Sequence, residues 1–220
     1  MIKFINDLKF NKLNKGMTYV ELIVVLSIFA VMTSVILFNY GEFQAKVDIK
    51  NLASDIALKI VEAQKSALSG KLPIQDRSST WKPSYGVYFD KVLDDKSFIY
   101  FANTVDSTNN SYNDVSCILP PTINGGECLD KIIISKGNII SQLEVFYQAG
   151  FIFSDIINDL TITFTRPNSG ATFKSTTPFD PSYAISYAQI TISSSNLSTT
   201  AKIKVYPSGS LYSSGSPKSI

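Results

Sequence analysis

The chain has 220 residues, of which 45% are apolar, a formal net charge of +2 and no histidine. The missing histidine excludes His-based catalytic triads and imidazole metal sites, and we expect neither a cofactor nor a metal. Residues 1–16 hold four lysines against Asp7, which leaves 16 basic and 17 acidic side chains in the other 204 residues. That balance removes a general electrostatic basis for nucleic-acid binding, which depends on many contacts between cations and phosphates.

The first predicted element is a membrane-spanning helix at residues 17–38. This segment reads MTYVELIVVLSIFAVMTSVILF and contains Glu21 as its single ionisable side chain. Its 22 residues, at about 1.5 Å each, are long enough to cross a hydrocarbon core about 30 Å thick. The lysines before it predict that residues 1–16 stay in the cytoplasm and that the chain after Phe38 lies outside, as a single-pass protein of the cytoplasmic membrane.

Glu21 needs an explanation, because an unpaired carboxylate in hydrocarbon costs several kcal/mol. One interpretation is that the carboxylate finds a partner or a proton, which would give it a function. The other is that it lies close enough to the start of the helix to reach the membrane interface. The residues that precede it favour the first interpretation.

Those residues resemble the cleavage and methylation motif of type IV prepilins and type II secretion pseudopilins. The motif is carried by Lys15, Gly16, Met17, Thr18, Tyr19, Val20 and Glu21, followed by the apolar run. The resemblance implies that a prepilin peptidase cuts residues 1–16 away between Gly16 and Met17 and methylates the new amine of Met17. It also implies that Glu21 neutralises an N-terminal amine when the subunit docks into a filament.

The implied partners are the peptidase, other pilins or pseudopilins that pack through the N-terminal helix, and an inner-membrane assembly platform. After assembly the filament would be periplasmic or on the cell surface. The sequence departs from the family pattern at Met17, where Phe is usual, and at Tyr19, where Leu is commoner. Phe38 stands where many major pilins have a proline, which favours a minor pilin or pseudopilin.

The helical pattern continues through residues 39–70. Apolar residues recur there at spacings of three and four, at Leu52, Ile56, Ile60, Ala63 and Ala67. Two i,i+4 ion pairs, Glu42 with Lys46 and Asp55 with Lys59, are expected on its exposed face. Gly70 is a typical helix stop, so the pattern predicts one helix from about Met17 to Ser69.

Residues 71–207 are predicted to form a β-rich head. Short runs of β-branched and aromatic residues predict strands at 85–89, 97–103, 131–135, 139–148, 160–165, 184–193 and 201–206. A tight hairpin is expected at Lys136–Asn138, and the core is expected to include Trp81, Phe151 and Phe164. Residues 208–220 are rich in serine and predict a flexible tail.

Two segments in the second half resemble the C-terminal pattern of the GspH/FimT-like branch of minor pilins. They are residues 164–170 (FTRPNSG) and 202–212 (KIKVYPSGSLY). Some members of that branch bind DNA through arginines near the C-terminus. Residues 207–220 hold only Lys218 as a basic side chain, so we do not transfer this role and consider a nucleic-acid partner unlikely to be part of the function.

Cys117 and Cys128 flank a Pro- and Gly-rich stretch and are expected to form a disulfide outside the cytoplasm. Two buried free thiols are the alternative. Residues 106–116 (DSTNNSYNDVS) are rich in oxygen donors, but they lack the spacing of a calcium loop and indicate a surface loop.

The expected fold is therefore α+β, a long helix packed on a C-terminal antiparallel β-sheet domain, as in pilins. The leading functional hypothesis is a structural subunit of a type IV pilus, a competence pseudopilus or a type II secretion filament. An alternative is a filament-tip adhesin or DNA-uptake receptor. A membrane-anchored enzyme would need acid–base residues, for which the candidates are Asp94, Asp95, Asp155 and Asp159. The latter two have helix-like spacing and are expected to be solvated, so we do not favour an enzyme.

Overall fold

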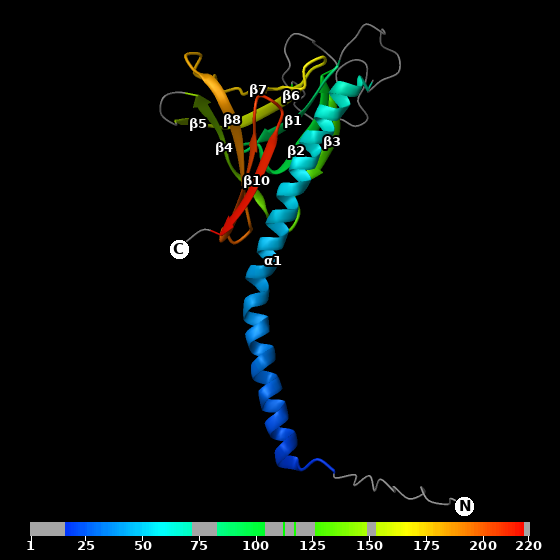
Figure 1. Cartoon of the computed structure of the whole chain (residues 1–220), viewed down its shortest axis with the longest axis vertical. Helices are drawn as coiled ribbons and strands as arrows, with labels where there is room; N and C mark the ends of the chain where they lie inside the picture. The colour runs from blue at the N-terminus through cyan, green and yellow to red at the C-terminus, as the bar shows by residue number, and fades with distance from the viewer. Residues whose placement is uncertain are drawn as a thin grey trace, which may run out of the picture. The chain divides into compact units, whose positions relative to one another are not determined.

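The computed structural model describes residues 16–71, 83–103, 112, 117, 126–148 and 153–217. These residues form one long helix followed by strands in two antiparallel sheets, so the chain is an α+β protein (Figure 1). The chain divides into two compact units, residues 1–43 and residues 44–220, and the helix contributes to both. Trp81, Phe151, residues 1–15 and all of residues 106–116 except Tyr112 lie outside the described residues.

The helix α1 (Tyr19–Ser69) has a defined beginning and end. At its start the backbone amide of Glu21 donates to the Thr18 hydroxyl over 3.3 Å, so Thr18 is the N-cap. At its end Gly70 has a φ of 64°, and the amides of Gly70 and Lys71 donate to the carbonyls of Ala67 and Ser66. This paired pattern closes the helix with a left-handed glycine, as Gly70 predicted.

Each sheet contains five strands. The first, called sheet 1, has the order β3-β2-β1-β6-β7 and consists of β1 (Ser84–Asp90), β2 (Asp94–Asn103), β3 (Cys128–Ile133), β6 (Asp159–Phe164) and β7 (Ala171–Lys174). Sheet 2 has the order β10-β9-β8-β4-β5 and consists of β4 (Ile139–Gln148), β5 (Ser154–Ile157), β8 (Ala184–Ser193), β9 (Thr199–Val205) and β10 (Leu211–Pro217). All strand pairs are antiparallel.

One core joins the two sheets to residues 49–67 of α1. The apolar stripe expected on the helix is buried, with Ile56, Ile60 and Ala63 at 0% exposure. Alternate residues of the strands point into the same core, as in β9, where Ile203 and Val205 are also fully buried. The helix stripe and the inner faces of both sheets thus exclude water together, which holds this part of α1 on the head.

Each of the seven predicted strands overlaps a strand of the structure, but three further strands were missed. β7 has only four residues, and β10 lies in the segment that we expected to be a flexible tail; it pairs with β9 along seven residues. β5 lies in residues 154–160 (SDIINDL), where the spacing of two aspartates resembles a helix. The described residues of the head form two antiparallel sheets, in agreement with the expected α+β class.

The prediction of a tight hairpin at Lys136–Asn138 is wrong in one respect. The tight turn is present, with φ values of 63° at Lys136 and 71° at Gly137. However, the strands that flank it, β3 and β4, belong to different sheets and do not pair. The turn therefore carries the chain from sheet 1 to sheet 2.

The ion pairs of α1 also differ from the expectation. Neither Glu42–Lys46 nor Asp55–Lys59 is among the ion pairs of the described residues. Lys59 instead pairs with Glu62 at 3.1 Å and with Asp130 of β3 at 3.4 Å. The contact with Asp130 joins the helix to the edge strand of sheet 1, so this lysine contributes to tertiary packing as well as to the helix surface.

Candidate functional site

The segment that carries the cleavage motif changes conformation at Thr18. Gly16, Met17 and Thr18 precede the helix, and the first turn of α1 follows at once with Tyr19. Met17 is 62% exposed. The bond between Gly16 and Met17 thus lies outside the helix, which begins at Tyr19.

Thr18 is a residue of this site whose role the sequence analysis missed. Its hydroxyl accepts the Glu21 amide, and its carbonyl accepts the Leu22 amide over 3.1 Å. The four-residue pattern Thr-x-x-Glu that precedes an apolar run is the known mark of a helix N-terminus and could have revealed it. The cap fixes the start of α1 directly after the motif's first residues.

Among the described residues, nothing requires a glycine at position 16. A Cβ atom added there would meet no other atom within 4 Å, and Gly16 is not among the glycines with positive φ. Gly70 and Gly209, in contrast, combine a positive φ with crowded surroundings. A demand for a small residue at Gly16 must therefore come from outside the described chain.

The apolar half of α1 is not covered by any other part of the described chain. Every large apolar side chain from Met17 to Leu37 is between 45% and 77% exposed. The hydroxyls of Ser27 and Thr33 donate to the helix's own carbonyls of Val24 and Phe29, each over 2.8 Å. The helix is long and apolar enough to cross a membrane, and its polar hydroxyls at these two positions are satisfied internally.

Glu21 is the exception in this apolar surface. It lies in the first turn of α1 and is exposed. Among the described residues, no hydrogen bond or ion pair reaches its carboxylate; only its backbone amide is engaged, by Thr18. The side chain is thus available for a partner outside this set of residues.

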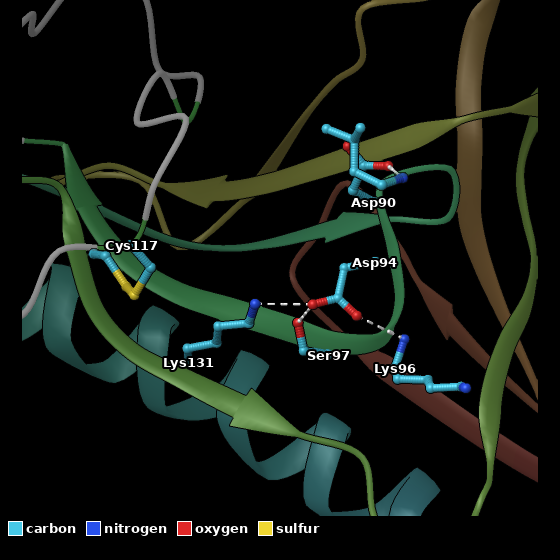
Figure 2. Close-up of polar contacts among 8 residues, drawn as sticks. Asp90, Asp94, Lys96, Ser97, Cys117 and Lys131 are labelled. Atoms are coloured by element: carbon cyan, nitrogen blue, oxygen red, sulfur yellow. Dashed lines mark hydrogen bonds and ion pairs between the residues drawn. A yellow bond between two sulfur atoms is a disulfide. The ribbon is translucent and has the colours of Figure 1, made fainter.

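The two cysteines form a disulfide between Cys117 and Cys128, with a Cα–Cα distance of 5.1 Å (Figure 2). Cys128 begins β3 and is fully buried, next to Phe101 of β2. The ring of Tyr112 lies 5.1 Å from that of Phe101 and 5.0 Å from that of Tyr88. Tyr112 and the bonded Cys117 therefore contact the face of sheet 1 that points away from the main core, and the two cysteines are not the free thiols considered as an alternative.

The acidic residues considered for catalysis have structural contacts. Figure 2 shows Asp94 between Lys131, which forms an ion pair with it at 2.8 Å, and Ser97, which donates a hydroxyl over 2.7 Å. The hydrogen bond from Lys131 holds the pKa of Asp94 below its usual value. An acid with a lowered pKa is poorly suited to donate protons near neutral pH.

Asp159 is buried, which corrects the expectation that it is solvated, whereas Asp155 is half-buried. Asp159 is 4% exposed and accepts hydrogen bonds from the amide and hydroxyl of Thr176 and from the Ser175 hydroxyl. Asp155 accepts the Tyr147 hydroxyl over 2.7 Å. Both carboxylates thus anchor neighbouring backbone and side chains, and no group of acids, Cys or His among the described residues could hold a metal.

A cleft of about 350 Å³ lies between α1 and sheet 1, lined by Lys59, Glu62, Lys71, Tyr85, Tyr100 and others. Its polar groups are engaged with the protein itself. Lys59 is paired as described above, the Tyr85 hydroxyl donates to the Lys71 carbonyl over 2.6 Å, and that of Tyr100 donates to the Ser66 hydroxyl over 3.0 Å. These contacts leave the cleft without a convergent set of groups for a ligand.

The two C-terminal motif segments lie against each other. The Ala171 amide, directly after residues 164–170, donates to the Pro207 carbonyl over 2.9 Å. Gln64 of α1 donates to the Ser169 carbonyl over 2.7 Å, and a Cβ at Gly209 would collide with that same glutamine. The turns that contain Ser169 and Gly209 therefore both contact Gln64 of α1. The contact at Gly209 leaves no room for a side chain.

Comparison with known proteins gives no match to a family model, a curated protein or a solved structure. The residues of the N-terminal motif and the surface of α1 therefore carry the functional interpretation.

Proposed function

We propose that this chain is a minor pilin or pseudopilin, a filament subunit that a prepilin peptidase releases by cutting between Gly16 and Met17. The observation that carries the proposal is the motif at residues 15–21, placed directly before an apolar helix with no cover in its own chain. A leader, a helix to be buried by other molecules and a β-rich head are the parts that such a subunit needs.

The geometry around the motif supports this role. Gly16 is a glycine that nothing in its own chain requires, as expected when a peptidase must bring its catalytic groups close to the backbone. Thr18 starts the helix only after the scissile bond. The cut would create an amine at Met17, four residues before the exposed carboxylate of Glu21.

Glu21 is the residue that we assign to assembly. Its carboxylate is costly in an apolar surrounding unless a cation lies beside it. The methylated amine of a neighbouring subunit's Met17 is such a cation, and it exists only after cleavage. Pairing of the two charges would couple processing to insertion, because an uncut chain could not offer the amine.

The head would follow the helix into the filament. Residues 49–67 of α1 are held in the core of the head by fully buried side chains such as Ile56 and Ile60. Each such side chain contributes about 1.5–3 kcal/mol through removal from water. Residues 49–67 of α1 would thus stay with the head when the subunit leaves the membrane.

Mass spectrometry of the protein purified from its host tests the proposal. We expect the mature chain to begin at N-methylated Met17 and a Gly16→Val variant to keep residues 1–16. Since nothing contacts a side chain at Gly16, the variant's head should show an unchanged unfolding transition. A wild-type N-terminus other than Met17 would refute the proposal.

A further inference from the structure

The turn between β1 and β2 displays two neighbouring apolar side chains to solvent. Val92 is 68% exposed, and Leu93, at 83%, is the most exposed large apolar side chain among the described residues. Single exposed apolar residues are common on protein surfaces, but two in succession on a short turn form a small projecting surface. We call residues 91–93 the knob.

The backbone of the knob is held in place by hydrogen bonds. The amides of Val92 and Leu93 both donate to Asp90 Oδ1, over 2.9 and 2.8 Å. The Lys91 amide donates to the Asn158 carbonyl over 2.9 Å, and the Tyr88 hydroxyl donates to the other oxygen of Asp90. Because the turn is already ordered, a contact made by Val92 and Leu93 would lose little conformational entropy.

A hollow that could receive such side chains lies between α1 and the edge of sheet 1. It has a volume of about 180 Å³, and its apolar walls are Leu52 of α1, Phe98 of β2 and Ile132 and Ile133 of β3. Ile133 is 74% exposed. Pockets for small molecules measure about 300–1,000 Å³, so this hollow is better matched to one or two side chains.

The charges beside the two surfaces are opposite. Lys91 is exposed on the knob, and Asp55 is exposed at the rim of the hollow. Neither belongs to an ion pair among the described residues. The other acid at the rim, Asp48, is already paired with Lys136 at 2.6 Å, so Asp55 is the carboxylate available to an incoming lysine.

We propose that the knob of one copy of this chain docks into the hollow of another copy, with Leu93 and Val92 against the apolar walls and Lys91 beside Asp55. The knob and the hollow are different surfaces, so the contact is heterologous and leaves one knob and one hollow free at the ends of any row. This inference rests on the proposed function as a filament subunit and adds that copies of this chain are neighbours in the filament.

Charge reversal in the full-length chain, expressed in its host, tests the contact. We expect Lys91→Glu and Asp55→Lys each to lower the yield of sheared filaments by at least tenfold, at equal amounts in the membrane. The double variant should restore the yield to within about twofold of wild type. Equal yields in all four proteins, or a double variant no better than the single ones, would overturn the proposal.

The apolar part of the contact has a matched control. Leu93→Ser should reduce the filament yield, whereas Leu197→Ser, a change in an exposed turn of sheet 2, should leave it unchanged. Equal effects of the two changes would argue against a specific role of the knob.

Cross-linking separates failure of this inference from failure of the proposed function, because it needs neither cleavage nor filaments. Two differently tagged full-length copies, one with Leu93→Cys and one with Asn51→Cys at the hollow, are treated in membranes with a short bis-maleimide. We expect a hetero-dimer that is absent when Leu197→Cys replaces Leu93→Cys. An uncut N-terminus together with this cross-link would refute the proposed filament subunit but support the contact between copies. Processed filaments without the cross-link would support the filament subunit and refute the contact.

Discussion

The two halves of α1 differ in whether their apolar side chains are buried by the rest of the described chain. From Ile49 to Ala67 the apolar stripe is almost completely buried by the two sheets of the head. From Met17 to Leu37 every large apolar side chain is exposed, all around the helix. One continuous helix thus contains a half whose composition is explained by its own fold and a half whose composition is explained only by surroundings that the chain does not supply.

The difference indicates how to separate stability from assembly. A substitution in the buried half should change the free energy of unfolding of the head. A substitution in the exposed half should leave that free energy unchanged and act on contacts with lipid or other subunits. The following variants test this division, from the largest expected effect to the smallest.

Glu21→Ala should have the largest effect, on assembly alone. Removal of the carboxylate leaves a neighbouring Met17 amine without a partner, so we expect the filament yield to fall by at least tenfold. Cleavage, membrane insertion and the unfolding of the head should be as in wild type. Normal incorporation of the variant into filaments, measured by immunoblot of sheared material, would show that Glu21 has no role in docking.

Ile60→Ala and Ile28→Ala make the same chemical change in the two halves. Ile60 is fully buried, and its truncation should destabilise the head by about 2–5 kcal/mol, since it leaves a cavity. Ile28 is 52% exposed, and its truncation should not alter head stability. Urea unfolding of the full-length protein in detergent, followed by near-UV circular dichroism, measures both; a similar loss in both variants would break the comparison.

Gly86→Ala and Gly41→Ala compare a glycine in the head with one in the exposed half of α1. A Cβ at Gly86 would meet the Ile162 carbonyl and lie 2.7 Å from the ring of Phe101, which covers this glycine. We expect a loss of about 1–3 kcal/mol from overpacking. A Cβ at Gly41 meets nothing within 4 Å, so this variant should not destabilise the protein and should gain helix propensity.

The ion pair between Asp48 and Lys136 should give the smallest effect, visible as a pH dependence. The hydrogen bond from Lys136 lowers the pKa of Asp48, so its contribution to stability is present above the unfolded pKa of about 3.9 and is lost as the pH falls through the folded value. Lys136→Met should therefore weaken the head at pH 7 but not at pH 2.

Thermal unfolding at both pH values measures this difference. Lys46→Met is the control, because Lys46 is exposed on the same helix and outside the ion pairs of the described residues. A Lys136→Met variant that loses as much stability at pH 2 as at pH 7 would show that the lysine acts through packing of its side chain.

The sequence predicted α1 well because its determinants are local. Gly70 ends the helix through its own positive φ, and the spacing of Ile56 and Ile60 is enough to identify the buried face. The strands at 139–148 and 184–193 were predicted with the bounds that the structure has, since each is a ten-residue run that contains five β-branched or aromatic residues.

The errors arose where a partner distant in the sequence decides the structure. β10 is a serine-rich edge strand that owes its conformation to pairing with β9, and β5 is a four-residue strand paired with β4. Asp159 is buried because Ser175 and Thr176 surround its carboxylate, which its spacing from Asp155 does not reveal. The hollow with Asp55 at its rim could not be predicted either, because its walls come from both α1 and sheet 1.

The N-terminal site was predicted from a short motif, and the structure adds what the motif leaves out. The open space around Gly16 requires coordinates, whereas the role of Thr18 as N-cap could have been read from the Thr-x-x-Glu pattern. No group among the described residues pairs with the Glu21 carboxylate, so the fold does not identify a partner for it.

The internal hydrogen bonds of Ser27 and Thr33 have a consequence for the path of the helix. Because both hydroxyls are bound to the helix's own carbonyls, these two residues need no polar group from lipid, from water or from a neighbouring helix. Lipid tails are as apolar as leucine side chains, so exchange of lipid neighbours for helical ones changes the free energy of this surface little. On the proposed function, the segment would therefore move from lipid into a filament with little change in free energy. Glu21 would be its one charged group whose surroundings change.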